Sequence, residues 1–458
     1  MTNLSGINLN NGSAVGAKRE GMYSPSQSLA LMPRYEAYKD SGVEWLGKLP
    51  NHWDAIKMKF LFKDTSVKNK PNETLLSVTQ NQGVVPREWV ENRMVMPSGN
   101  LESFKFIEKE DFAISLRSFE GGLEYCHHDG IISPAYTVLK AKKDYLLARY
   151  YKYLFKSQMF ISELQTSIVG IREGKNISYE ELQYSLLPIP TEDEQTLIAN
   201  FLDKKTAQID DAIAIKEQQI SLLKERKQII IQQAVTQGLD PNVPMKDSGV
   251  DWIGKIPDHW EVRRAKYIFD EVDERSKNGD EELLSVSHMT GVTPRSEKNV
   301  SMFMAEDYTG SKLCIENDLV INIMWAWMGA LGVSDRVGIV SPSYGVFRQK
   351  LKNTFNPTYL EYLLKSVKYV EYYNKVSTGL HSSRLRFYGH MLFAMKMGYP
   401  SYEEQNEIMA YLHEQTKRID LAIDSQLAQI EKLKEYKTTL INSAVTGKIK
   451  ITPEMVEQ

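Results

Sequence analysis

The sequence predicts an α+β protein in which two similar mixed α/β lobes are joined by two long helices that form an antiparallel coiled coil. Five blocks of sequence occur twice, in the same order, at an offset that drifts only from 207 (Lys39 to Lys246) to 210 (Ala234 to Ala444). Each copy ends in a long stretch whose apolar residues follow a 3.5-residue repeat. The 458 residues therefore form one internal duplication with a pseudo-two-fold relation between its copies.

The repeated blocks define the order of parts within each copy. The first block, Lys-Asp-Ser-Gly-Val-Glu-Trp-Leu-Gly-Lys-Leu-Pro-Asn-His-Trp at Lys39–Trp53, returns almost unchanged at Lys246–Trp260. The other pairs are Leu75–Val78 and Leu283–Val286, Ile131–Tyr136 and Ile339–Tyr344, Pro190–Gln195 and Pro400–Gln405, and Ala234–Thr236 and Ala444–Thr446. Five ordered matches at one spacing are not produced by chance.

The part that follows the first block in each copy predicts a compact lobe. Short β-branched and aromatic runs bounded by Gly, Pro, Asn and Ser indicate strands, as at Thr74–Val78, Phe112–Leu116, Tyr136–Leu139 and Leu319–Ile323. A helical stretch closes each lobe, at Asp144–Leu164 and Pro357–Val376. The longest apolar run, Leu319–Val333, contains Asn322 and is shorter than the roughly 20 residues of a membrane-spanning helix. It indicates buried strands.

A long helix follows each lobe. Thr191 with Glu194, and Ser401 with Glu404, form capping-box pairs at its start, and Gly238 and Gly447 occupy its C-cap. The seam residues are Ile209, Ile213, Ile220, Leu223 and Ile230, then Ile419, Ile423, Ile430, Leu433 and Leu440. Polar residues at the skipped seam positions, Lys216, Lys227, Gln426 and Lys437, predict a fixed register. The alternative, an amphipathic helix packed on its own lobe, is less favoured because the two stripes match.

The parts divide the chain at boundaries that the blocks mark. We expect a partly flexible N-terminal leader (1–37), two lobes (38–190 and 241–400), two helical regions (191–240 and 401–448) and a tail (449–458). Each long helix has about 33 residues and would therefore be roughly 50 Å long. If the two helices are antiparallel, the lobes lie at opposite ends. Separated heads suit duplex DNA, whose major groove recurs about every 34–36 Å on one face.

The sequences of the two lobes differ outside the repeated blocks. Arg117–Gly122 in the first lobe stands against Met324–Gly329 in the second. Two different heads predict the reading of two different half-sites. Each lobe carries 20 basic and 19 acidic residues, whereas residues 191–240 and residues 401–458 each carry three more acidic than basic residues, within a net charge of −3. Such weakly basic lobes predict that tight DNA binding needs further subunits.

The composition indicates the cellular compartment of the protein. Two cysteines, Cys126 and Cys314, exclude a disulfide framework and indicate a reducing compartment. An Asn-, Gly- and Ser-rich beginning does not resemble a signal peptide, so a cytoplasmic location is expected.

Two segments resemble nucleotide-binding or catalytic motifs, but neither matches its motif in full. Gly170–Asn176 lacks the spacing and the hydroxyl of a nucleotide-binding P-loop. Asn356-Pro357-Thr358-Tyr359 is one residue away from an adenine methyltransferase loop, and no glycine-rich cofactor turn precedes it. The eight histidines offer no spaced metal set, and we expect His52 and His259 to pack beneath the tryptophans of their blocks. A catalytic role, a metal and a cofactor are therefore not expected in this chain.

The duplicated blocks resemble those of the specificity subunits of type I restriction–modification enzymes. The resemblance rests on the paired openings at Lys39 and Lys246, the paired Pro-(Thr/Ser)-x-x-Glu-Gln helix starts and the paired Ala-Val-Thr ends. It runs from about Leu31 to Lys448 and does not explain the leader Met1–Ala30.

This resemblance implies a non-catalytic subunit that reads an asymmetric bipartite DNA sequence, with one lobe on each half-site. The helical regions would set the spacer and dock two methyltransferase subunits for adenine methylation, and motor-nuclease subunits would join for restriction. S-adenosylmethionine, ATP and Mg²⁺ are expected on those partners. No membrane partner is implied.

Residues for DNA contact are sought on loops that differ between the lobes yet begin at matched positions. The candidates are Arg87, Arg117, Arg172, Lys175 and Asn176 in the first lobe, and Arg295, His381, Ser382, Arg384 and Arg386 in the second. The matched pair Arg87 and Arg295 is expected to hold phosphate or structure. Trp325 and Trp327 alternate in an apolar run and are expected in the core.

A different class of function remains open at this point: a coiled-coil scaffold whose lobes bind protein and not DNA. A self-sufficient nuclease or methyltransferase is disfavoured because its motifs are missing.

Overall fold

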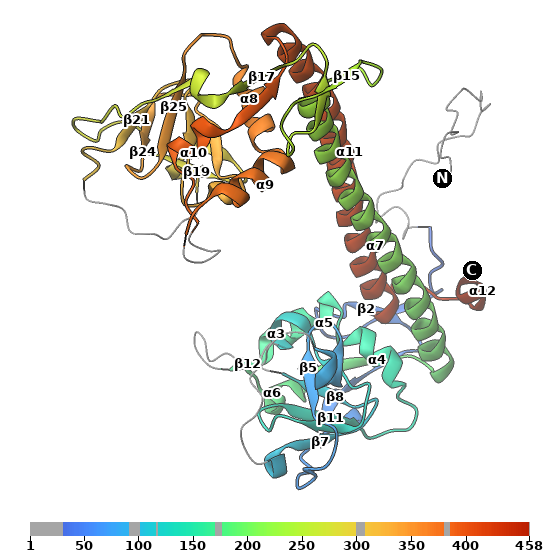
Figure 1. Ribbon diagram of the computed structural model, residues 1–458. Helices are drawn as coiled ribbons and strands as arrows, with labels where there is room; N and C mark the ends of the chain where they lie inside the picture. Colours follow the sequence, from blue (N-terminus) through green and yellow to red (C-terminus); the bar gives the residue numbers. More distant parts are fainter. Residues whose placement is uncertain are drawn as a thin grey trace, which may run out of the picture. The chain divides into compact units, whose positions relative to one another are not determined.

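The computed structural model describes residues 31–90, 101–115, 118–169, 176–298, 307–379 and 385–457 (Figure 1). The chain forms two compact units, one from residues 1–216 and 427–458 and the other from residues 217–426. Each unit contains one lobe and the adjoining halves of the two long helices, α7 (Glu192–Gln237) and α11 (Tyr402–Val445). The boundary between the two compact units therefore falls within both long helices.

The lobe of the first unit is built on a four-stranded antiparallel sheet in the order β4-β11-β8-β9. These strands are β4 (Phe62–Thr65), β11 (Thr137–Ala141), β8 (Phe112–Ile114) and β9 (Glu124–Tyr125). The antiparallel pairs around it are β1 (Tyr38–Asp40) with β2 (Lys48–Pro50), β3 (Asp54–Lys57) with β14 (Leu186–Ile189), β5 (Leu76–Thr79) with β6 (Gly83–Pro86), β7 (Lys105–Ile107) with β10 (Gly130–Ile132), and β12 (Ile168–Val169) with β13 (Asn176–Ile177). The short helices are α2 (Met58–Leu61), α3 (Ser118–Gly121) and α6 (Tyr179–Leu182).

Among the described residues, the lobe of the second unit repeats this plan except for the β12–β13 pair. Its sheet has the order β18-β25-β22-β23, from β18 (Phe269–Glu271), β25 (Gly345–Gln349), β22 (Leu319–Ile321) and β23 (Leu331–Val333). The pairs are β15 (Met245–Asp247) with β16 (Lys255–Pro257), β17 (Glu261–Arg264) with β26 (Lys396–Tyr399), β19 (Leu284–Ser287) with β20 (Gly291–Pro294), and β21 (Lys312–Cys314) with β24 (Gly338–Val340). The predicted duplication is thus a duplication of fold.

Each predicted closing helical stretch is a pair of helices. In the first unit these are α4 (Ala148–Leu154) and α5 (Gln158–Leu164), and in the second α8 (Pro357–Leu364) and α9 (Val367–Val376). The break in the first unit lies at Ser157, whose backbone is extended and whose hydroxyl accepts the N–H of Phe160. A serine in this role starts a new helix because it satisfies a donor that the first turn leaves free.

Two hydrophobic cores lie in each lobe. The larger core joins the lobe to the long helices and contains Trp53 in the first unit and Trp260 in the second. A smaller core lies under the β5–β6 hairpin, where Leu76 and Val84 pack with Cys126 and Val138. The second unit has the same small core under the β19–β20 hairpin, from Leu284, Val286, Val292, Cys314, Val320, Val340 and Val346. Each hairpin is therefore packed against its lobe.

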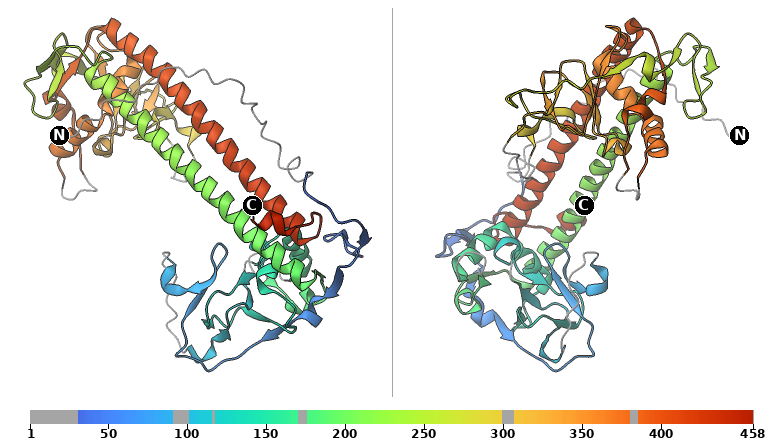
Figure 2. Two further views of the ribbon diagram at one scale, coloured as in Figure 1. Left: turned by 90° about the vertical axis from the view of Figure 1, so that its right-hand side faces the viewer. Right: turned by 60° about the vertical axis from the view of Figure 1, so that its left-hand side comes forward.

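Helices α7 and α11 lie side by side and antiparallel in each unit (Figures 1 and 2). In the first unit Lys437 of α11 pairs with Asp210 of α7 at 2.7 Å, and Lys216 donates to Gln429. In the second unit Lys227 pairs with Asp420 at 2.7 Å. All ten predicted seam residues are buried or half-buried. The mixed lobes and the two long antiparallel helices confirm the predicted fold class.

The polar residues on the seam pair according to the duplication. Lys227 and Lys437 occupy matched positions, as do their partners Asp420 and Asp210. Exposed ion pairs of this kind stabilise by at most about 1 kcal/mol each. Their effect is on register, because a shift by one turn would separate both lysines from their aspartates.

The first block of each lobe holds the start of its own long helix. Trp53 is fully buried, and its Nε1 donates to Glu194 Oε2 at 3.0 Å, while His52 Nε2 lies 3.0 Å from Glu194 Oε1. Trp260 and His259 make the same contacts with Glu404, at 3.0 and 2.7 Å. The expectation that the histidines pack beneath the tryptophans is wrong, since both are half exposed and bind the carboxylate from the solvent side.

The same lobe also holds the end of the other long helix. Tyr150 is buried and donates its hydroxyl to the carbonyl of Val445, 2.7 Å away at the end of α11. In the second unit Tyr359 donates to the carbonyl of Val235 near the end of α7, at 2.9 Å. These contacts with one helix start and one helix end in each unit are called the helix clamp below.

A buried glutamine completes the helix clamp. Gln195 accepts the N–H of Leu147 and donates to the carbonyls of Tyr145 and Pro190. Gln405 makes the matching contacts with Asn356, Thr354 and Pro400. Each amide satisfies three backbone groups that the turn into the helix would otherwise leave unpaired in the interior. The duplicated Glu-Gln pair is therefore required by this joint.

Burial tends to raise the pKa of Glu194, but the hydrogen bonds from His52, Trp53 and the backbone of Thr191 outweigh it and lower that pKa below its usual value. The ionised carboxylate is the form that these donors stabilise.

Within the described residues, no helix is both long and apolar enough to cross a membrane. Cys126 and Cys314 are buried free thiols.

The substitution Glu194→Ala should lower the free energy of unfolding by about 1–3 kcal/mol, because the buried indole N–H of Trp53 loses its acceptor. Glu404→Ala should have the same effect in the second unit. Denaturant titration followed by tryptophan fluorescence measures both. The matched control is Glu192→Ala, an exposed acid in the same helical turn, for which a loss below about 1 kcal/mol is expected. Equal losses for Glu194 and Glu192 would contradict the clamp.

Candidate nucleic-acid interface

The matched arginines Arg87 and Arg295 follow the two hairpins at the same place. Each begins a short 3₁₀ turn directly after the hairpin's second strand, and its backbone N–H donates to the residue before the first strand, Leu75 at 3.1 Å and Leu283 at 2.9 Å. The two arginines are therefore held by the same frame. Both side chains are half-buried at the base of their hairpins.

A hydroxyl on the first strand of each hairpin binds a basic side chain. Arg87 Nη1 lies 3.4 Å from Ser77 Oγ, a long hydrogen bond, and in the second lobe Lys298 Nζ donates to Ser285 Oγ at 3.1 Å. Lys298 takes this place although Arg295 is the residue that matches Arg87 by sequence. The base of each hairpin thus carries positive charge.

Basic groups gather at the base of the second hairpin. Partial burial lowers the pKa of Lys298, and the neighbouring charges of Arg295 and Lys365 lower it further. Lys365 is paired with Glu361 at 2.7 Å, so the positive charge at this hairpin base comes from Arg295 and Lys298, which repel each other and would be stabilised by a bound anion. Sequence reasoning proposed Arg295 alone; Lys298 and Lys365 come from different elements, and only the fold brings them to it.

The other proposed contact residues are distributed unevenly over the described chain. Arg386 is half-buried, pairs through its backbone with Thr378, and donates Nη1 to the carbonyl of Leu385. Asn176 belongs to strand β13, opposite Val169. The remaining candidates lie outside the described residues: Arg117, Arg172, Lys175, His381, Ser382 and Arg384.

Trp325 is not in the core, and that expectation is wrong. Its side chain is 46% exposed, and its ring lies 5.8 Å from the half-buried ring of Trp327. The apolar run does not continue as a strand here, because residues 326–328 form a 3₁₀ turn that ends at Gly329 with a φ of +81°. Met328 in the same turn is also 40% exposed. The second lobe therefore presents an aromatic and apolar surface where the first lobe's matched segment is polar.

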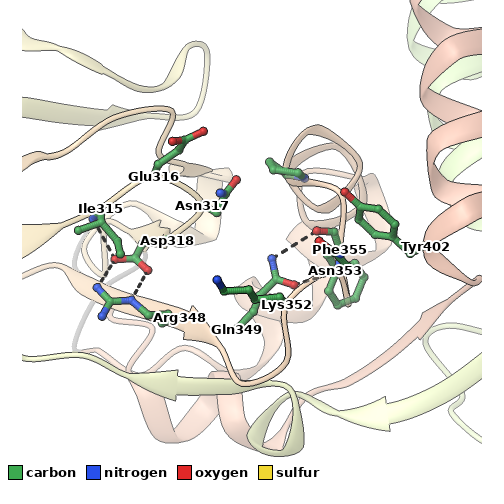
Figure 3. Close-up of a pocket in the computed structure, with 11 residues that line it drawn as sticks. Ile315, Glu316, Asn317, Asp318, Arg348, Gln349, Lys352, Asn353, Phe355 and Tyr402 are labelled. Atoms are coloured by element: carbon green, nitrogen blue, oxygen red, sulfur yellow. Dashed lines mark hydrogen bonds and ion pairs between the residues drawn. The ribbon is translucent and has the colours of Figure 1, made fainter.

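A pocket of about 340 Å³ lies in the second unit, between the turn before β22 and the start of α8 (Figure 3). Its principal charges are already paired. Arg348 binds both oxygens of the buried Asp318, at 2.8 and 2.9 Å, and contacts Glu274 at 2.9 Å. Gln349 closes the far side by exchanging hydrogen bonds with the backbone of Phe355. We assign this pocket no chemistry.

The first lobe has a buried aspartate at the matching position, but its neighbours differ. Asp111 accepts the N–H of Glu108 at 3.1 Å as Asp318 accepts that of Ile315, but Lys140, in the place of Arg348, binds Glu108 instead. Burial, with the charge of Asp129 nearby, raises the pKa of Asp111 from 3.8 to about 7, against a smaller opposing effect of Lys63. The first lobe therefore contains an acid that titrates near neutral pH.

Among the described residues, no group of three or more His, Cys, Asp or Glu side chains is placed to hold a metal ion.

Raising the pH from 5 to 8 should destabilise the first lobe through Asp111. The folded-state pKa is higher than the unfolded one, so folding takes up a proton between the two values, and the stability this group contributes at low pH is lost as the pH rises through about 7. Asp111→Asn should remove the contribution of Asp111 and stabilise the protein at pH 8, while a second contribution remains from Glu124, whose pKa burial raises to about 7 against the charge of Lys156. Thermal melting across this pH range measures it. Asp318→Asn serves as a contrast, since it removes the buried carboxylate that Arg348 binds through two nitrogens and leaves Arg348 only Glu274, so it should destabilise across this pH range.

The chain was compared with known proteins. No family model matches it. The type I restriction enzyme MjaVIII specificity subunit of Methanocaldococcus jannaschii is 23% identical over 424 residues, which cover 88% of this chain and 94% of the relative. The type I restriction enzyme EcoBI specificity subunit of Escherichia coli is 26% identical over 139 residues, about 30% of each chain.

Two solved structures share the fold. One, described as the structural basis of complex assembly and conformational transition of the type I R-M system, has a TM-score of 0.62 at 15% identity and covers 87% of this chain and 98% of its own. The HsdS subunit from Thermoanaerobacter tengcongensis has a TM-score of 0.53 at 15% identity, over 88% and 98%. The chain is therefore similar over most of its length, in sequence and in fold, to the specificity subunits of type I restriction enzymes, which confirms the resemblance carried by its duplicated blocks.

Proposed function

We propose that this chain is the sequence-specific DNA-binding subunit of a type I restriction–modification complex. Each lobe reads one half of an asymmetric bipartite target, and the chain itself is non-catalytic. The observation that carries the proposal is the pairing of two equal frames with unequal surfaces. The contacts of the helix clamp and the register of the two hairpins correspond between the units, whereas the exposed residues they present differ. A protein selected to bind one target twice would have kept both surfaces alike.

The long helices are proposed to dock two methyltransferase subunits. Ile215, Leu222 and Ile229 of α7 are 48–57% exposed and recur every seven residues, so they lie on one face of the helix, away from the seam. A stripe of this kind is typical of a helix that packs on a further partner. Motor-nuclease subunits would join this assembly for restriction. S-adenosylmethionine, ATP and Mg²⁺ would be held by the partners.

The rival function, a scaffold whose lobes bind protein, makes a different prediction for DNA. The assembled complex should bind duplex DNA with an affinity that falls steeply as salt rises, because phosphate contacts release counterions. Indifference to DNA, even with the methyltransferase subunit present, would support the scaffold.

The double substitution Arg295→Ala and Lys298→Ala should weaken DNA binding by the complex. If both groups hold phosphate, the slope of log K against log salt should become smaller by about 1–2, and the loss should be similar for all sequences. Fluorescence anisotropy at several salt concentrations measures this. The control is Lys352→Ala, an exposed lysine of the same lobe that lines the pocket in Figure 3. An equal effect of the control would show that only the net charge of the lobe matters, and not the position of Arg295 and Lys298.

Removing seven residues from each long helix at facing positions should shorten the recognised spacer and leave both half-sites unchanged. A heptad deletion preserves the seam, and it removes about 10 Å of helix, the length of about three base pairs. Methylome sequencing of a host that carries the variant measures the spacer. Altered half-sites with an unchanged spacer would show that the lobes are not the readers.

A further inference from the structure

The two hairpins differ at their tips within one common frame. In the first lobe Thr79 pairs with Gly83 across a loop of three residues, and in the second lobe Ser287 pairs with Gly291 across a loop of the same length. The loop residues are Gln80, Asn81 and Gln82 in the first lobe and His288, Met289 and Thr290 in the second, and all six are exposed.

The turns that carry these tips are built in the same way. Thr79 Oγ1 accepts the N–H of Gln82 at 3.0 Å, and Ser287 Oγ accepts the N–H of Thr290 at 3.2 Å. Gly83 and Gly291 follow with φ of +75° and +65°. A Cβ at either glycine would come within 2.5 Å of a neighbour, Tyr125 O in one lobe and Glu361 Oε1 in the other. The backbone of the two tips is thus fixed, and their side chains are the part that varies.

An ion pair from the lobe supports each tip. Lys156 donates to the carbonyl of Gln80 at 3.0 Å and to that of Gly121 at 2.9 Å while it pairs with the buried Glu124 at 2.6 Å. In the second lobe Glu361, paired with Lys365 at 2.7 Å, lies against Gly291 and accepts the N–H of Val333 at 3.1 Å. Supported in this way, a tip loses little conformational freedom when it binds.

Thr290 Oγ1 lies 2.8 Å from Ser287 Oγ and the Gln80 side chain lies beside Gly121, whereas the central tip residues Asn81 and Met289 are exposed. Met289 is 81% exposed, so its apolar side chain is accessible to a partner. The cations at the hairpin bases, Arg87 in one lobe and Arg295 with Lys298 in the other, lie where phosphate contact would bring the tips toward base edges.

On the basis of the proposed function, we propose that Gln80-Asn81-Gln82 and His288-Met289-Thr290 are the base-reading elements of the two lobes. The amide side chains of the first tip suit adenine, whose N7 and N6 offer an acceptor and a donor to one Asn or Gln. The methionine of the second tip suits the C5 methyl group of thymine, which takes apolar contact. The two lobes thereby read different bases from the same position of the same fold.

Exchanging the tips tests this assignment. One variant carries Gln80→His, Asn81→Met and Gln82→Thr, and the other carries His288→Gln, Met289→Asn and Thr290→Gln. Each variant is expressed with the methyltransferase subunit, and the methylome is sequenced. We expect each exchange to change one to three adjacent positions of one half-site only, with discrimination at those positions altered about ten- to hundredfold. Each variant is the control for the other.

The outcomes separate this proposal from the proposed function. If the wild-type complex methylates no bipartite motif, the proposed function fails. If it does and both exchanges leave the motif unchanged, the tips do not read bases. Should an exchange abolish methylation, the single substitutions Asn81→Ser and Met289→Ala decide: relaxed preference at one position supports the assignment, and an unchanged motif overturns it.

A base analogue tests the thymine contact directly. Uracil in place of thymine in the half-site that the second exchange alters removes only the methyl group. Binding of the wild-type complex should weaken about tenfold, and binding of the Met289→Ala complex should not respond. Equal sensitivity of the two complexes would overturn the contact of Met289 with thymine.

Discussion

The organisation of each unit depends on the helix clamp. One carboxylate, Glu194 or Glu404, closes the first turn of a long helix and accepts the indole N–H of a buried tryptophan. One tyrosine hydroxyl, from Tyr150 or Tyr359, takes up a carbonyl at the end of the other helix. Each lobe is thereby fastened to two antiparallel helices at once. A lobe fixed to one helix alone could rotate about it, and a reading surface would lose its orientation.

This constraint explains which residues occur twice. The blocks Lys39–Trp53 and Lys246–Trp260, the Glu-Gln pairs and the Ala-Val-Thr helix ends are the parts of the clamp. Residues away from it are free to change, provided that the sheet and the small core under the hairpin remain packed. The division between constant frame and variable surface is therefore a division between buried hydrogen bonds, which are costly to alter, and exposed side chains, which are not.

Sequence reasoning reached the fold because its signals were local or repeated. The heptad pattern from Ile209 to Ile230 predicts a seam from spacing alone, and the duplication fixes the equivalence of the lobes. It could not place Tyr150 against Val445, since a single tyrosine 295 residues from its partner leaves no pattern. It also misjudged His52 and Trp325. A histidine inside a block flanked by tryptophans indicates packing, and an alternating apolar run indicates a core strand, unless a turn such as the one at Gly329 intervenes.

The candidate interface was only partly accessible from sequence. Arg87 and Arg295 could be singled out because they are matched, but the company of Lys298 and Lys365 depends on a hairpin, a turn and a helix meeting in space. The hairpin tips could have been found by asking where two matched blocks enclose unmatched residues. The equal spacing of Val78 and Gly83 and of Val286 and Gly291 already gives the two loops one length, and the register across β5–β6 and β19–β20 shows that these loops are hairpin tips.

The composition of the first unit also affects how the protein is made. Residues 217–426 form the second unit without interruption, whereas the first unit joins residues before 217 to residues after 426. Val445, Ile449 and Ile451 complete the large core of the first lobe, so the lobe that leaves the ribosome first is finished last. Until then the buried face that awaits α11 is open to water and to other chains. The order of synthesis thus favours a chaperone, or an early-bound companion subunit, at that face.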